Sequence, residues 1–163
     1  MEELQRVNRI LCHKSWRAAT EQIAVLEENR SFCCHNIDHL IHVARLAGLE
    51  NLERDLGISM ELIYSAALLH DIGRGRQYIE GIPHEEAGAM MAVSILNDCG
   101  FGEEEKEKIL DAIRSHRNRA VSEEATLRGL IYRADKLSRN CFACAAESDC
   151  NRAREKKNLH LVR

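Results

Sequence analysis

Residues 66–84, AALLHDIGRGRQYIEGIPH, join an apolar run to two neighbouring ionisable residues and end on a further histidine. The run AALL is typical of a buried helix face, whereas His70 and Asp71 are costly to bury without a partner. Adjacent residues on a helix do not face each other, so these two cannot simply form a surface pair. The stretch therefore predicts a buried helix that delivers His70 and Asp71 to an interior site.

The rest of the chain carries the apolar spacing of amphipathic helices. Ser59 is placed to cap a helix over residues 60–72, which Gly73 is expected to stop. Ser122 is expected to begin the last helix, and residues 73–83, rich in glycine and arginine with the single proline, are predicted to be a loop. The other helices are expected over residues 2–28 (as one helix or two), 35–49, 85–98, 103–116 and 123–140.

Composition agrees with an all-α bundle of about six helices. The 163 residues are 45% hydrophobic and 30% charged but only 4% aromatic, with one proline. A β-sandwich or barrel would need more turn residues and more β-branched runs. A chain of this length favours one domain, which we expect over residues 1–140 with a cysteine-containing tail, residues 141–163, packed on it.

Charge and hydropathy limit the partners and the location. The net charge of −3 gives no general reason to expect nucleic acid or a membrane surface. No stretch reaches the roughly 18 consecutive apolar residues of a membrane span. The N-terminal sequence MEELQRVNRI is charged and does not resemble a signal peptide. We therefore expect a cytoplasmic protein.

Nearly every predicted helix after the first offers a histidine or an aspartate at an end or on an apolar stretch. Charged groups at such places need a partner or a metal ion. Imidazole nitrogens and carboxylate oxygens together suit Mn, Fe, Co, Ni, Zn or Mg better than a soft ion that prefers thiolates alone. The candidate metal ligands are His39, His70, Asp71, His84, His116 and Asp135.

The order His39 … His70-Asp71 … Asp135 resembles the H…HD…D signature of the HD-domain phosphohydrolase superfamily. The contexts DHLIHVARLAG, AALLHDIGRG and YRADKLSR are also similar to those of the family, with Arg74 where lysine is common. The resemblance covers about residues 35–140. It implies a helical core in which the four ligands surround one divalent cation, with Asp71 as a catalytic residue.

The same resemblance bears on the two remaining histidines. Family members with two more histidines between the HD pair and the last aspartate often bind a second metal ion, bridged by the HD aspartate. His84 and His116 stand where those ligands would fall. The alternative is that they contact the substrate phosphate, or the metal-bound water, over a single metal ion.

The implied function is hydrolysis of a phosphomonoester or phosphodiester, in a nucleotide or another small phosphate ester, by a metal-activated water. Lys136 is the candidate catalytic cation, and His35 and Arg74 are candidate substrate contacts. The alternative for these three residues is surface charge or support of a ligand. The alternative functions are a di-iron oxygenase of the HD type and a non-catalytic nucleotide or redox sensor.

Cysteines follow the last ligand-bearing helix as C-x2-C-x5-C, formed by Cys141, Cys144 and Cys150. Three thiolates suit either zinc with a fourth ligand or an iron–sulfur cluster. Because an HD site would bring the His39 helix to the last helix, Cys33 would lie near the start of the tail. We predict a metal site of these four cysteines; the alternatives are reduced thiols that pack the tail and a redox-active pair.

Overall fold

The computed structural model of the chain describes residues 3–161. Within this range the backbone is mainly helical and contains no strand, so the predicted all-α class is confirmed. The α-helices of the described residues are α1 (Gln5–Cys12), α2 (Lys14–Leu26), α3 (Ile37–Glu53), α4 (Met60–Leu69), α5 (Arg74–Glu80), α6 (His84–Cys99), α7 (Glu103–Ser115) and α8 (Leu127–Leu137).

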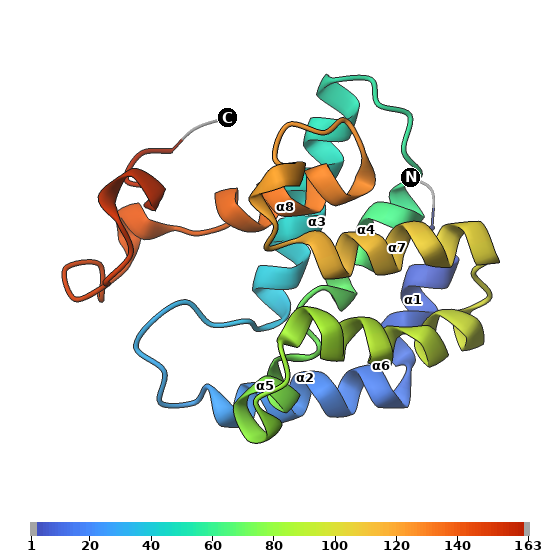
Figure 1. The fold of residues 1–163 in the computed structure, drawn as a ribbon, viewed down its shortest axis with the longest axis horizontal. Coiled ribbons are helices and arrows are strands. Elements are labelled where there is room, and N and C mark those ends of the chain that lie inside the picture. The colour runs from blue at the N-terminus through green and yellow to red at the C-terminus, as the bar shows by residue number, and fades with distance from the viewer. Residues whose placement is uncertain (1–2, 162–163) are drawn as a thin grey trace.

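Helix α4 is the central element of the bundle, because α1, α3, α6, α7 and α8 all pack against it (Figure 1). Its buried positions include every residue from 65 to 69, which explains its apolar sequence. Trp16 on α2 is also buried and donates its indole N–H to the Leu68 carbonyl oxygen at 2.9 Å. The core otherwise consists largely of Leu, Ile, Val and Ala, as the low aromatic content requires.

The predicted loop over residues 73–83 is wrong, because Arg74–Glu80 forms α5. Gly73 occupies the N-cap position, and Gly81 ends the helix in the left-handed conformation with φ of 74°. Arg76 and Glu80 form an ion pair one turn apart at 2.7 Å. These two glycines therefore cap a short helix rather than mark a flexible connection.

The N-terminal region agrees with the two-helix alternative of the prediction, and the start of the last helix differs from it. The N-terminal helical region is divided at His13, whose side chain caps α2 by accepting a hydrogen bond from the Ser15 backbone N–H at 3.2 Å. The last helix begins at Leu127 because Thr126, rather than Ser122, provides the N-cap side chain. The bundle therefore has more and shorter helices than the predicted six.

The segment after α8 leaves the bundle and returns toward it (red in Figure 1). As far as residue 161, its helical structure is limited to short 3-10 turns at Cys141–Ala143 and Arg154–Lys156. Asn158 fixes its return by donating hydrogen bonds to the carbonyl oxygens of Lys136 at 2.8 Å and Arg139 at 2.9 Å. The described part of the chain has no helix with the length and hydropathy needed to cross a membrane.

Candidate metal centre

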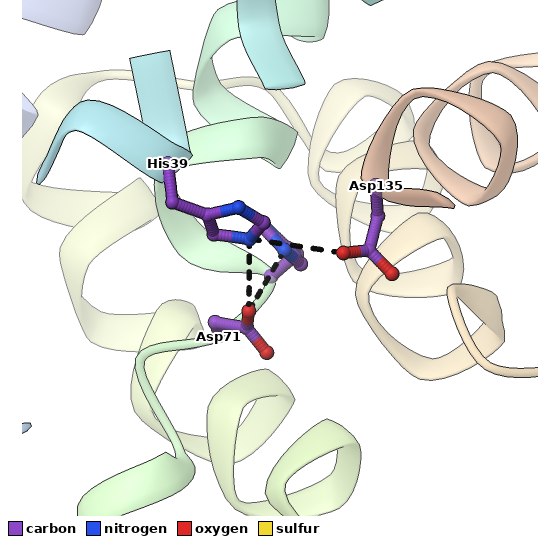
Figure 2. A group of neighbouring side chains, drawn as sticks. His39, Asp71 and Asp135 are labelled. Carbon is purple, nitrogen blue, oxygen red and sulfur yellow. Dashed lines mark ion pairs between the residues drawn. The ribbon is translucent and has the colours of Figure 1, made fainter. Parts of the chain in front are cut away.

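Four of the predicted ligands meet at the C-terminal end of α4. His70 and Asp71 follow this helix and are only 0% and 1% exposed. His39 comes from the first turns of α3 and Asp135 from α8, and the His39 ring points between the two aspartates (Figure 2). One ligand atom from each of the four residues lies within 4.8 Å of the other three.

The distances in this group suit a shared cation. His39 Nε2 lies 3.4 Å from Asp71 Oδ2 and 3.7 Å from Asp135 Oδ1, and His70 Nε2 lies 3.0 Å from Asp71 Oδ2. Three of these atoms, His39 Nε2, His70 Nε2 and Asp71 Oδ2, are buried without a hydrogen-bond partner among the described residues. Buried polar atoms normally have a partner. The mixed nitrogen and oxygen donors therefore fit a divalent metal ion.

A second ligand group lies on the other side of Asp71. Asp71 Oδ1 is 3.3 Å from His84 Nε2 and 3.7 Å from His116 Nε2, and these two nitrogens are 3.0 Å apart. All three ligand atoms again lie within 4.8 Å of one another. Asp71 thus turns one carboxylate oxygen toward each group, which is the arrangement of a carboxylate that bridges two ions.

Main-chain carbonyl groups orient two of the imidazoles. His70 Nδ1 donates to the Ala67 carbonyl oxygen at 2.7 Å, and His116 Nδ1 donates to the Ile113 carbonyl oxygen at 2.7 Å. Each acceptor lies three residues earlier, at the end of the helix that carries the histidine. Such a bond at Nδ1 leaves the Nε2 lone pair free for a metal ion.

Side chains that the sequence prediction missed orient the other two imidazoles. His84 Nδ1 donates to Gln77 Oε1 at 2.5 Å, and His39 Nδ1 lies 3.3 Å from Ser138 Oγ. Gln77 falls in the stretch predicted as a loop, so the sequence could not indicate where its side chain points. Ser138 lies three residues after Asp135 on the last helix, and this helical spacing is the one signal that could have indicated it.

The histidines of the second group are held in the neutral, metal-binding form. Burial and the Arg74 guanidinium lower the pKa of His84 to about 3. Burial and the neighbouring His70 lower the pKa of His116 to about 4. Because a metal ion binds deprotonated imidazole, both residues are in the required state near pH 7.

Cations contact the carboxylates of the site from the solvent side. Arg74 Nε donates to Asp71 Oδ1 at 2.9 Å, the Lys136 ammonium pairs with Asp135 Oδ2, and Arg139 lies 3.5 Å from the same oxygen. Burial raises the pKa of Asp135, but the positive charges of Lys136, His70 and Arg139 together more than offset this, and the pKa lies below its ordinary value. Arg74 and Lys136, predicted to act on the substrate, thus sit beside the ligand carboxylates.

His35 lies at the wall of the site and is linked to a buried glutamate. Its Nδ1 is 2.6 Å from Glu27 Oε1, and its backbone N–H donates to Glu27 Oε2 at 2.7 Å. Tyr78 donates its hydroxyl to Glu27 Oε1 at 2.6 Å. The His35 ring meets the His39 ring edge-on with 5.5 Å between centroids. The predicted substrate contact is therefore also a support for a ligand histidine.

Two cavities open on the centre from different directions. A cavity of about 930 Å³ reaches His39 and is walled by residues 30–36 and by the tail. A second, of about 850 Å³, reaches His84 and His116. Four cations and one ligand line both cavities; they are Arg74, Arg139, Arg152, Lys156 and Asp135. Arg152 and Lys156 come from the tail, and no local motif marked them in the sequence.

The four predicted cysteine ligands line the first cavity, but their sulfur atoms are not gathered at one point. Among residues 3–161, groups of three or more candidate ligand atoms within 4.8 Å of one another are the two that contain Asp71. All seven cysteines of the chain are free of disulfides in the structure. A preformed site for one tetrahedral ion is therefore absent from the described residues.

The chain belongs to the HD domain family, whose model matches residues 36–140. An uncharacterized protein of Clostridium beijerinckii is 40% identical over 158 residues, which cover 97% of this chain and 99% of that protein. Ribonuclease Y of Enterococcus faecalis is 35% identical over 127 residues, covering 77% of this chain and 22% of that protein. The chain thus spans about a fifth of that ribonuclease.

A solved structure agrees with the family assignment. The crystal structure of a predicted HD superfamily hydrolase from an uncultured Thermotogales bacterium matches with a TM-score of 0.61 and 26% identity. The match covers 76% of this chain and 66% of that one. The resemblance seen in the sequence is therefore confirmed at the level of family and fold. HD domains bind divalent metals, and the two His/Asp groups of this chain are suited to hold them.

Proposed function

We propose that this protein is a phosphohydrolase that uses two divalent metal ions to hydrolyse a phosphodiester in a nucleotide or another small molecule. The observation that carries the proposal is the position of Asp71, with one oxygen toward His39 and His70 and the other toward His84 and His116. Paired ions at such a carboxylate are a common means of phosphoryl transfer.

The residues around the centre can hold the metal ions and neutralise the negative charge of a bound phosphate. A divalent ion bound there supplies a Lewis acid and lowers the pKa of a coordinated water toward neutrality. Arg74, Arg139, Arg152 and Lys156 stand around both approaches and neutralise the phosphate oxygens. Lys136 is buried enough to lower its pKa, yet its pairing with Asp135 keeps it beside the same centre.

The shape of the site favours a diester over a monoester. A phosphate at the centre has open space on the His39 side and on the His84 side, in cavities of about 930 and 850 Å³. A phosphodiester carries a substituent on each side, whereas a monoester needs one. The related ribonucleases Y, by their name, act on RNA, which is joined by phosphodiesters, and this supports the same choice.

A substrate panel with Mn²⁺, Co²⁺ or Mg²⁺ tests the proposal. The panel pairs bis(4-nitrophenyl) phosphate with 4-nitrophenyl phosphate and adds cyclic dinucleotides and short RNA. We expect hydrolysis of the diesters, and we expect Asp71→Asn to reduce kcat on the order of a thousandfold, because metal ions contribute several kcal/mol to such reactions. Asp98→Asn, an exposed residue outside both cavities, is the matched control and should keep full activity.

Three results would contradict the proposal in whole or in part. If no phosphorylated substrate is hydrolysed with any of the three metals, the protein is not a phosphohydrolase of this kind. If the protein retains iron and consumes oxygen, the result supports the di-iron oxygenase instead. Faster turnover of the monoester than of the matched diester would overturn the choice between the two ester classes.

A further inference from the structure

Five of the seven cysteines line the first cavity, although they come from segments about a hundred residues apart in the sequence. The segment before α3 and the segment after α8 project on the same side of the bundle (Figure 1). The remaining two cysteines, Cys12 and Cys99, lie outside the cavity. The cysteines of the cavity are Cys33, Cys34, Cys141, Cys144 and Cys150.

Backbone hydrogen bonds three residues apart link the segment that carries the three tail cysteines. The backbone N–H of Cys144 bonds to the carbonyl of Cys141 at 3.2 Å, that of Glu147 to Cys144 at 3.1 Å, and that of Cys150 to Glu147 at 3.2 Å. Each bond closes a turn, and these turns hold the three cysteines within one short segment. All three cysteines of the C-x2-C-x5-C spacing line the cavity.

The opposite wall supplies a fourth thiol. Arg30 Nε donates to the Cys33 carbonyl oxygen at 2.9 Å and thereby fixes the backbone of this segment. The neighbouring Cys34 thiol is turned toward its own segment, where it donates to the Phe32 carbonyl oxygen at 3.5 Å. Cys33 is therefore the better candidate to face the tail.

Cationic side chains lie close to the cysteines of the cavity. Lys157 binds the Glu147 carboxylate at 2.8 Å, and this hydrogen bond, with smaller contributions from Cys150 and Cys141, raises the pKa of Lys157. Its ammonium group thus lies within electrostatic reach of two of the sulfurs. Arg152 lines the same cavity.

We propose that Cys33, Cys141, Cys144 and Cys150 bind an iron–sulfur cluster in this cavity. Sulfur ligands favour soft ions and iron–sulfur clusters. One tetrahedral zinc ion would require the four sulfurs within about 4 Å of one another, because each Zn–S bond is about 2.3 Å. Among the described residues no three of these sulfurs lie within 4.8 Å of one another. In a [4Fe–4S] cluster each cysteine binds a different iron atom, so a wider spacing of the sulfurs suits this cluster better than a single zinc ion.

Such a cluster would hold the tail in place against the bundle. The cysteine turns and the return through Asn158 enclose the segment that carries Arg152 and Lys156 to the metal centre. With the cluster bound, residues 141–157 would be tied to the segment before α3. Without it, their order would depend on the few hydrogen bonds described above.

The test is chemical analysis of the full chain purified without oxygen and reconstituted with iron and sulfide. Acid-labile sulfide is the decisive quantity, because an HD centre loaded with iron contains none. We expect sulfide and a visible absorption band in the wild type, and at least a tenfold loss of both in Cys141→Ser and in Cys33→Ser. Cys12→Ser, an exposed cysteine outside the cavity, and Cys34→Ser are matched controls that should keep both.

A second measurement separates loss of the cluster from loss of the fold. Amide exchange in Cys141→Ser should become faster in residues 141–157 and stay unchanged in α4 (Met60–Leu69). The proposal is overturned if the reconstituted wild type holds no sulfide, or holds zinc at these thiols instead. It is also overturned if sulfide survives in Cys141→Ser, or is lost in Cys34→Ser but kept in Cys33→Ser.

Discussion

Asp71 is only 1% exposed, and its two carboxylate oxygens face different pairs of histidines. This explains why an apolar helix ends on His70 and Asp71: the pair stands where α3, α6, α7 and α8 converge. The sequence could predict the ligands because each is a chemically distinctive residue in an apolar context. It could not predict Gln77, Ser138 or Glu27, whose roles depend on tertiary contacts.

Glu27 provides a prediction at this scale. Burial raises its pKa, but hydrogen bonds from His35 and Tyr78 more than offset this and lower it from 4.5 to about 2. The carboxylate therefore stabilises the folded state above pH 4.5, and the contribution is lost as the pH falls toward 2. We expect Glu27→Gln to lower the unfolding free energy by about 2 kcal/mol at pH 7, measured by urea denaturation.

The pH dependence distinguishes this cause from general loss of packing. The difference between wild type and Glu27→Gln should shrink between pH 4.5 and pH 3, because the carboxyl of the unfolded chain takes up a proton there while that of the folded chain stays ionised. Glu28→Gln, at an exposed neighbour, should change stability by less than about 0.5 kcal/mol. A difference that is the same at pH 7 and pH 3 would contradict the account.

Among the helices, the junction of α4, α5 and α6 was the hardest to predict. Glycine occurs both in loops and at helix caps. The sequence RGRQYIEG therefore does not distinguish a loop from a short capped helix without the tertiary structure. Here α5 packs against α2 and α6, and these contacts stabilise a helix too short to persist alone. Long helices with strong apolar spacing, such as α6 and α7, were predicted within about two residues of their observed ends.

Gly73 tests the importance of this junction. A Cβ at Gly73 would lie 2.2 Å from the His84 carbonyl oxygen and 2.3 Å from the Gly88 backbone nitrogen. These are backbone atoms and cannot move without shifting the start of α6, which carries His84. We expect Gly73→Ala to lower the unfolding free energy by about 3 kcal/mol, measured by urea denaturation.

Gly102→Ala is the matched control for this substitution. An added Cβ at Gly102 has its nearest neighbour, Glu105 Oε2, at 3.7 Å, which is ordinary contact. Its cost should stay within about 1 kcal/mol, as expected for a change at a helix start. Equal costs for the two variants would show that close approach at Gly73 is not what fixes the junction.

Across the whole molecule, the bundle and the tail differed in how far the sequence could predict them. Residues 36–140 form the family's helical core, and the order of its ligands along the chain was enough to anticipate it. The tail has no apolar spacing, and its course depends on Asn158 and on the cavity it encloses. Its contribution of Arg152 and Lys156 to the site therefore appeared only in the structure.

The central claim is that Asp71 bridges two metal ions. The most direct test is equilibrium dialysis of Mn²⁺ against the full chain, combined with electron paramagnetic resonance of the loaded protein. Mn²⁺ suits this test because it prefers oxygen and nitrogen ligands over the thiols of the tail. We predict two ions per chain with a spin-coupled spectrum, and one ion with an uncoupled spectrum in His116→Gln. One ion per chain in the wild type, or two ions without coupling, would contradict the account.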